Sequence, residues 1–239
     1  MRENMKFLFI GDSITDGGRG RNGDPNHILG HGFAAYVSST LGSSCAACRP
    51  KFYNRGNSGE TSWEIRQRWQ TDALDLAPDV LTLLCGVNDM LAVSRDPEKA
   101  ECSQEGFAAN LRDMLTRTRA VLPDTGMILG VPFFYEVTDV DDRFSTPDDL
   151  QEQRTTLRYR KVFTSGAAAK LADIAIRQET VRQIAKEFGC VLLDIPALFE
   201  KAFTEAPPSY WIWDGVHPTY AMHGRIAGEW LRLWEEIDL

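Results

Sequence analysis

Short apolar runs alternate with helix-like patterns along the 239 residues of the chain. Because short apolar runs of this kind are typical of buried strands, we expect five strands. They are predicted at residues 6–10, 51–56, 79–87, 127–134 and 191–195. Helices are predicted between them at 31–42, 61–74, 105–122 and about 166–188, and a last helix is predicted from Pro218 onward.

The helix boundaries carry recognisable end signals. Thr61 or Ser62 is a candidate N-cap, and Glu64 stands three residues after Thr61, where a capping box places its acidic partner. Gly189 ends the long fourth helix, and a proline at 218 suits a first helical turn. These local signals support the alternating order of elements.

Strands that alternate with helices and are buried on both sides indicate a parallel sheet covered on two faces. We therefore predict an α/β protein with one three-layer α/β/α domain that spans residues 1–239. The segment 136–161 is acidic first and basic later and has no clear period. We expect it to be a surface excursion near the active face, partly helical.

The composition and net charge limit the classes of molecule that the protein is expected to bind. Hydrophobic residues make up 43% and charged residues 25% of the chain, as in an ordinary globular protein, and the formal net charge is −8. That charge disfavours nucleic acid and anionic membranes as partners. It leaves neutral small molecules, such as a sugar or an ester, as candidate substrates.

The cysteines and the N-terminal sequence indicate the cellular compartment in which the protein is expected. Five cysteines, an odd count, point to a reducing compartment. Cys45 and Cys48 form C-x-x-C, but without a second pair we interpret them as reduced loop thiols rather than a metal site. The sequence shows neither a signal-peptide pattern nor an apolar run long enough for a membrane span. We therefore expect a cytoplasmic protein.

Ligands of such sheets bind outside the carboxyl ends of the strands, so the chemistry is sought there. Ser13 follows the first strand, and His217 lies in a loop just before Pro218. A serine hydroxyl needs a nearby base to become a nucleophile, and His217 is the best candidate among four histidines. Asp214, three residues earlier, could accept a hydrogen bond from the other ring nitrogen and fix the tautomer.

An acyl-transfer site also needs donors for the oxyanion. The backbone N–H of Ser13 is one candidate. The backbone at Gly59, open because glycine has no Cβ, is a second, and the side-chain amide of Asn88 is a third. Together these residues supply every part that acyl transfer requires.

Four blocks of the chain resemble those of the SGNH hydrolases, also called the GDSL family. They are GDSITD (11–16), N-x-G-x-S-G-x-T (54–61), G-x-N-D (86–89) and D-x-x-H-P (214–218). The resemblance implies a flavodoxin-like fold, Ser13 as nucleophile, His217 as base and Asp214 as its partner. It also implies Ser13, Gly59 and Asn88 as oxyanion donors, and a reaction without a metal or organic cofactor.

Within this family the chain is most similar to intracellular bacterial acetylesterases that act on xylo-oligosaccharides. The similarity rests on FIGDSITDGGR, LGHGF (29–33), the glycine block and WDGVHP. It implies a serine esterase for short acyl esters, with acetylated oligosaccharides as substrates and possible assembly into homo-oligomers. The acyl preference and the alcohol half of the substrate stay open, and a lysophospholipase- or thioesterase-type activity is the alternative within the family.

Two other functions compete with this hypothesis. A phosphate-handling enzyme would use the glycine-containing loop after the first strand, but the P-loop and dinucleotide motifs are missing. A non-catalytic carbohydrate-binding protein would need a broken catalytic set, whereas all five positions are present.

Several further residues have more than one interpretation. Asp12 is expected to stabilise the turn before Ser13, and we keep it with Trp213 as a candidate substrate-binding residue. Trp211 and Trp213 would share a face if their segment were extended, and either could line the substrate site or pack in the core. Trp63 is expected to be a core residue.

Overall fold

The structure is a computed structural model, and it describes residues 1–139, 158 and 160–237. Most of the segment 136–161, expected as a surface excursion, lies outside the described residues. The strands are β1 (Lys6–Gly11), β2 (Lys51–Gly56), β3 (Val80–Leu84), β4 (Gly126–Gly130) and β5 (Val191–Leu193). The helices are α1 (Ser13–Asp16), α2 (Phe33–Ser44), α3 (Ser62–Gln67), α4 (Val87–Arg95), α5 (Gln104–Val121), α7 (Ala167–Phe188), α8 (Ile195–Phe203), α9 (Pro208–Trp211) and α10 (Tyr220–Leu233).

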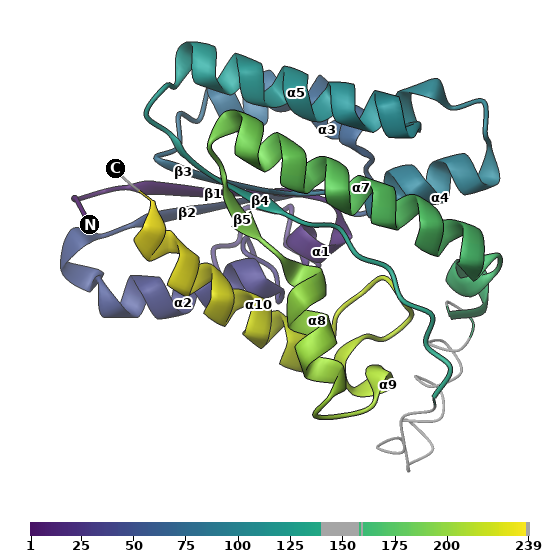
Figure 1. The fold of residues 1–239 in the computed structure, drawn as a ribbon. Helices are drawn as coiled ribbons and strands as arrows, with labels where there is room; N and C mark the ends of the chain where they lie inside the picture. Colours follow the sequence, from purple (N-terminus) through teal and green to yellow (C-terminus); the bar gives the residue numbers. More distant parts are fainter. Residues whose placement is uncertain (140–157, 159, 238–239) are drawn as a thin grey trace.

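The five strands form one parallel sheet in the order β2-β1-β3-β4-β5 (Figure 1). This is the flavodoxin-like order, which confirms the predicted fold class. The order reverses between β1 and β3, so the loops after these two strands diverge and leave a crevice at their carboxyl ends. Ser13 follows β1 and Asn88 follows β3, which places both at this crevice.

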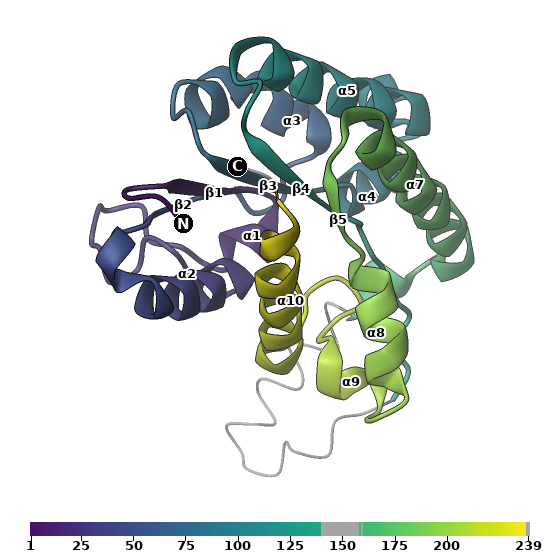
Figure 2. The ribbon, with the colours of Figure 1, turned by 60° about the vertical axis from the view of Figure 1, so that its left-hand side comes forward.

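Helices cover both faces of the sheet (Figure 2). Side chains alternate along each strand, so β1 sends Phe7 and Phe9 toward α2 and α10, and Leu8 and Ile10 toward α3, α5 and α7. The only polar centre of β3 is Thr82, whose Oγ1 accepts a hydrogen bond of 2.9 Å from the indole of buried Trp230. The two cores fix the sheet and, with it, the positions of the strand ends.

Two strand ends differ from the prediction. The run 79–87 ends as a strand at Leu84, because Gly86 turns the backbone with a φ of 128° and α4 begins at Val87. The run 127–134 ends as a strand at Gly130, because β5, its outer neighbour, pairs only as far as that residue. Apolar character continues past both ends, which is why the pattern alone overestimates their length.

End signals at the helices are mostly confirmed. Thr61 and Glu64 form the capping box, and Gly189 ends α7 in the left-handed conformation. The last helix begins at Tyr220 rather than Pro218, because the side chain of Thr219 caps it. No helix within the described ranges combines the length and the apolar character of a membrane span.

Candidate active site

Ser13 is the first residue of α1 and lies directly beyond the carboxyl end of β1. Asp12 caps this short helix by accepting a hydrogen bond of 3.0 Å from the N–H of Ile14. Gly11 packs so closely that a Cβ there would lie 2.2 Å from the carbonyl oxygen of Leu84. The glycine and the cap therefore fix the sharp turn that presents the Ser13 hydroxyl.

His217 lies on a loop whose shape is set by Asp214. One oxygen of Asp214, Oδ1, accepts hydrogen bonds from the N–H groups of Val216 and His217 at 2.9 and 2.8 Å. Its other oxygen, Oδ2, lies 2.7 Å from Nδ1 of the His217 ring. Gly215, between them, has a φ of 95°, and a Cβ there would meet the carbonyl oxygen of Tyr135 at 2.3 Å. The carboxylate thus holds both the loop and the ring.

The other ring nitrogen of His217, Nε2, lies 2.9 Å from Oγ of Ser13. Residues 204 positions apart in the chain therefore meet at hydrogen-bond distance. With the proton of the ring on Nδ1, facing Asp214, Nε2 is free to accept the hydroxyl proton. The three side chains form one continuous chain of hydrogen bonds, with the geometry that general-base activation of a serine requires.

The groups around the His217 ring favour its protonated, charged form. Burial opposes protonation of His217, but the hydrogen bond and negative charge of Asp214 outweigh it, so the pKa of His217 is raised above its usual value. Burial also opposes ionisation of Asp214, yet the hydrogen bond and charge of His217, with two backbone N–H groups, keep the pKa of Asp214 below its usual value. An imidazolium formed during a reaction would therefore be stabilised.

The glycine block reaches from the serine block to the asparagine block. At one end, the N–H and hydroxyl of Ser58 donate to Oδ2 of Asp16 at 2.9 and 2.7 Å. At the other end, the side-chain amide of Asn88 donates to the carbonyl oxygen of Glu60 at 3.1 Å. Gly59 lies between these anchors, with a φ of 86° and no atom within 4 Å of where a Cβ would be. The predicted oxyanion residues thus lie on one connected loop system.

Asp16 is a site residue that the sequence reasoning missed. It is buried, and besides Ser58 it accepts hydrogen bonds from Arg21 at 2.8 and 2.9 Å and from the N–H of Arg19 at 3.0 Å. Burial opposes its charge, but these bonds hold the pKa of Asp16 below its usual range. Its position inside the GDSITD block was the only signal that the sequence offered.

A cavity of about 270 Å³ opens beside the Ser13 hydroxyl. It is lined by Ser13, Ile14, Gly17, Gly18, His31, Ser58, Trp213, His217, Pro218, Tyr220 and His223. Trp213 and Tyr220 bring aromatic rings to its wall, with ring centroids 6.5 Å apart. Trp211, by contrast, is buried at the end of α9 and does not line the cavity, so the two tryptophans do not share a face.

Two further expectations concern single side chains. Asp12 is fully buried and caps α1, which matches the turn-stabilising role, while its role in substrate binding stays a prediction. Burial raises the pKa of Asp12 to about 7. Trp63 is 40% exposed on α3, so the expectation that it belongs to the core was wrong. A helix with only one buried face leaves room for an exposed aromatic ring.

His223 also contacts the cavity and was not singled out from the sequence. Its Nδ1 accepts a hydrogen bond of 3.1 Å from the N–H of Phe33, at the start of α2. Burial, with the nearby charges of His31 and His217, lowers the pKa of His223 to about 3. It is therefore neutral at physiological pH and serves to cap α2 at the cavity wall.

Comparisons with known proteins identify the family of this chain. The model of the GDSL-like lipase/acylhydrolase family matches residues 9–225. The acetylxylan esterase of Geobacillus stearothermophilus is 30% identical over 231 residues, which are 95% of this chain and 92% of that protein. The crystal structure of Axe2, an acetylxylan esterase from the same organism, matches with a TM-score of 0.76 and 28% identity, over 97% of this chain and 94% of its own.

A second solved structure has the same fold. LAE5, described as an alpha/beta hydrolase enzyme from the metagenome of Lake Arreo in Spain, matches with a TM-score of 0.76 and 25% identity, over 100% of this chain and 99% of its own. The family match covers both the serine block and the loop of His217. The chain therefore belongs to the GDSL-like lipase/acylhydrolase family and is a carboxylic ester hydrolase.

Proposed function

We propose that this protein is a serine esterase that removes short acyl groups, acetyl groups first, from O-acylated oligosaccharides. The observation that carries the proposal is the unbroken hydrogen-bond chain from Asp214 through His217 to Ser13, at 2.7 and 2.9 Å. In the Geobacillus esterase Axe2, alanine variants of an aspartate and of a histidine three positions later are both described as catalytic mutants. Asp214 and His217 have the same spacing.

The mechanism follows from the proton positions. Nε2 of His217 takes the proton of Ser13 as Oγ attacks the ester carbonyl, and the resulting imidazolium is held by Asp214. His217 then delivers the proton to the leaving alcohol. Water, activated by the same imidazole, hydrolyses the acyl-enzyme and restores Ser13. The reaction written this way needs neither a metal nor an organic cofactor.

The oxyanion would be stabilised by three donors. The N–H groups of Ser13 and Gly59 are backbone donors. Gly59 has a positive φ and no Cβ, so no side chain obstructs a substrate that approaches its N–H. Asn88 gives one amide hydrogen to Glu60, which orients the side chain and leaves its second hydrogen for the oxyanion. Each such donor typically contributes about 3 kcal/mol to transition-state stabilisation.

The size and walls of the cavity favour a small acyl group on a sugar. Its volume of about 270 Å³ lies below the ~300–1,000 Å³ typical of sites for drug-sized ligands. The rings of Trp213 and Tyr220 offer apolar faces against which a sugar ring can stack. The Geobacillus relatives are named as acetylxylan esterases. A location in the cytoplasm and assembly into homo-oligomers accompany this proposal as predictions from the sequence.

The preferred length of the substrate's acyl chain distinguishes this proposal from a lysophospholipase- or thioesterase-type activity. With p-nitrophenyl acetate, butyrate and octanoate, we expect kcat/KM to be highest for acetate and to fall at each step, because the polar side chains of His31, Ser58 and His223 on the cavity wall offer a long alkyl chain few apolar contacts. Acetylated xylose and xylo-oligosaccharides should be deacetylated, as measured by acetate release. A higher kcat/KM for the octanoyl ester than for the acetyl ester would contradict the proposal.

The two functions outside the esterase class gain no support. A phosphate-handling enzyme fits the serine block alone, and a non-catalytic sugar-binding protein would need a broken catalytic set, whereas all five positions are present. The family match extends across residues 9–225 and includes all four blocks.

A further inference from the structure

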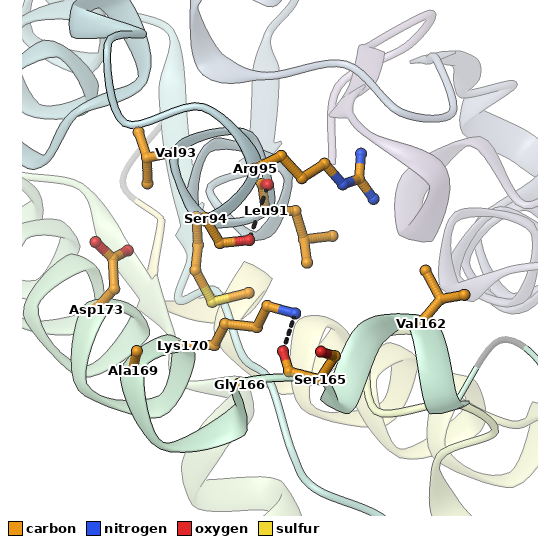
Figure 3. A pocket seen from close by; sticks show the side chains of 11 residues that line it. Leu91, Val93, Ser94, Arg95, Val162, Ser165, Gly166, Ala169, Lys170 and Asp173 are labelled. Atoms are coloured by element: carbon orange, nitrogen blue, oxygen red, sulfur yellow. Dashed lines mark hydrogen bonds between the residues drawn. The ribbon is translucent and has the colours of Figure 1, made fainter.

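A second cavity, of about 510 Å³, lies between α4 and the start of α7 (Figure 3). It is lined by Met90, Leu91, Val93, Ser94, Arg95, Val162, Ser165, Gly166, Ala169, Lys170 and Asp173. Its volume falls within the range typical of small-molecule sites. None of these residues lines the cavity beside Ser13, so the two cavities have separate walls.

Each wall of this α4–α7 cavity is connected to the candidate active site through a neighbouring residue. One wall is α4, whose second residue is Asn88, and Arg95 lies roughly 10 Å further along the same helix at 1.5 Å per residue. The other wall includes Val162, next to Phe163, whose ring packs edge-on against the His217 ring with centroids 6.0 Å apart. A substrate bound at Ser13 could therefore extend into this cavity.

The polar groups of the cavity are mainly cationic. Lys170 is 7% exposed, and its Nζ donates to the carbonyl oxygens of Phe163 and Ser165 at 2.6 and 2.7 Å. An ammonium carries three hydrogens, so one remains for a ligand. Figure 3 shows the Lys170 side chain reaching from α7 into the cavity toward α4. Arg95 extends from the end of α4, and across the described part of the chain no carboxylate lies within ion-pair distance of it.

The backbone adds to this positive field. Gly166 precedes the 22-residue helix α7 without a side-chain cap, and the first turn of α7 has no acidic residue. The N-terminus of a long helix attracts negative charge. The one carboxylate in the lining, Asp173, is already bonded to Arg177 and Gln104. The rest of the wall consists of aliphatic side chains and Met90, together with Ser94 and Ser165.

We propose that the α4–α7 cavity is a subsite for a carboxylate carried by the alcohol half of the ester, bound by Lys170 and Arg95. The aliphatic side chains of Leu91 and Val162 would contact the carbon body next to that carboxylate. This inference rests on the proposed esterase function and adds the charge of the preferred substrate to it. Because the chain as a whole carries a net charge of −8, a preference for an anion requires a local cationic site.

The test compares two acetyl esters that differ only in charge, 3-(4-acetoxyphenyl)propanoate and 3-(4-acetoxyphenyl)propanamide. We expect kcat/KM of the native enzyme to be about tenfold higher for the carboxylate, the effect of a charge-assisted hydrogen bond. Added salt should reduce this ratio. A ratio of one or below would overturn the proposal.

Single-residue variants test which side chains cause the preference for the carboxylate ester. Arg95→Met should bring the carboxylate-to-amide ratio toward one, and so should Lys170→Met. Arg112→Met removes an equal charge from α5, where Arg112 pairs with Glu187 at the far end of α7, and should leave the ratio as in the native enzyme. An unchanged ratio in Arg95→Met would overturn the proposal. If Lys170→Met lowered the turnover of both esters but kept the native carboxylate-to-amide ratio, Lys170 would only hold the turn at 163–165.

Binding is measured separately from turnover. Calorimetric titration of Ser13→Ala with the carboxylate and the amide should give a lower Kd for the carboxylate, and Arg95→Met should remove that difference. Equal Kd values would overturn the subsite proposal even if the esterase is active. Conversely, absence of turnover on p-nitrophenyl acetate with a clear difference in Kd would count against the esterase and for the anionic subsite.

Discussion

Replacing Ser13 by alanine is expected to lower kcat for p-nitrophenyl acetate by at least about 10⁴-fold, the scale of losses when a catalytic nucleophile is removed. The physical reason is that no other hydroxyl is described at hydrogen-bond distance from Nε2 of His217. Only the oxyanion donors and binding would remain in the variant. Measurement of kcat and KM, with circular dichroism to verify folding, checks the prediction.

The matched control is Ser39→Ala. Ser39 is exposed on α2, and among the described residues its hydroxyl donates only to the backbone carbonyl oxygen of Tyr36, at 3.0 Å. This variant should keep native kcat and KM. If Ser13→Ala kept substantial turnover while Ser39→Ala behaved as native, Ser13 would not be the nucleophile.

The second large effect is expected at Asp214. Asp214→Asn can still accept the N–H bonds of Val216 and His217, so the loop should keep its shape. Its neutral amide cannot stabilise the imidazolium, and its NH₂ group facing Nδ1 would favour the wrong tautomer of His217. We expect kcat to fall by about 10³- to 10⁴-fold, the magnitude known for the corresponding change in a serine protease.

A control for charge alone is Asp113→Asn on α5, where Asp113 pairs with Arg66 at the surface. Exposed pairs of this kind contribute little, so kcat should stay within about twofold of native. A fall of less than tenfold in Asp214→Asn, with the fold intact, would mean that the bond between Asp214 and His217 does not govern the reaction.

The sheet and its helices could be predicted because their signals are local. Buried parallel strands appear as short apolar runs, and the capping box at Thr61 and the glycine at 189 mark helix ends within a few residues. The ends of β3 and β4 could not be predicted as well. A strand ends where its neighbour no longer pairs, and that depends on residues far away in the sequence.

The parts of the candidate site that lie in short sequence blocks could also be predicted, whereas contacts between loops could not. Ser13, Asp214 and His217 lie in short blocks at strand ends and helix starts, where topology alone brings them to one edge of the sheet. The role of Asp16 was missed, because its partners Ser58 and Arg21 are identified only once the loops have folded against each other. The burial of Trp211 and the exposure of Trp63 likewise depend on how short helices are placed.

Activation of Ser13 by His217 can be measured by the rate at which a fluorophosphonate labels the protein at different pH values. We predict a single adduct, mapped to Ser13 by mass spectrometry. Labelling needs neutral His217, so the rate should be highest at alkaline pH and fall as the pH drops through the raised pKa of His217, above the usual 6.5. An adduct on another residue, or equal labelling of Ser13 at pH 5 and pH 8, would show that His217 does not activate Ser13.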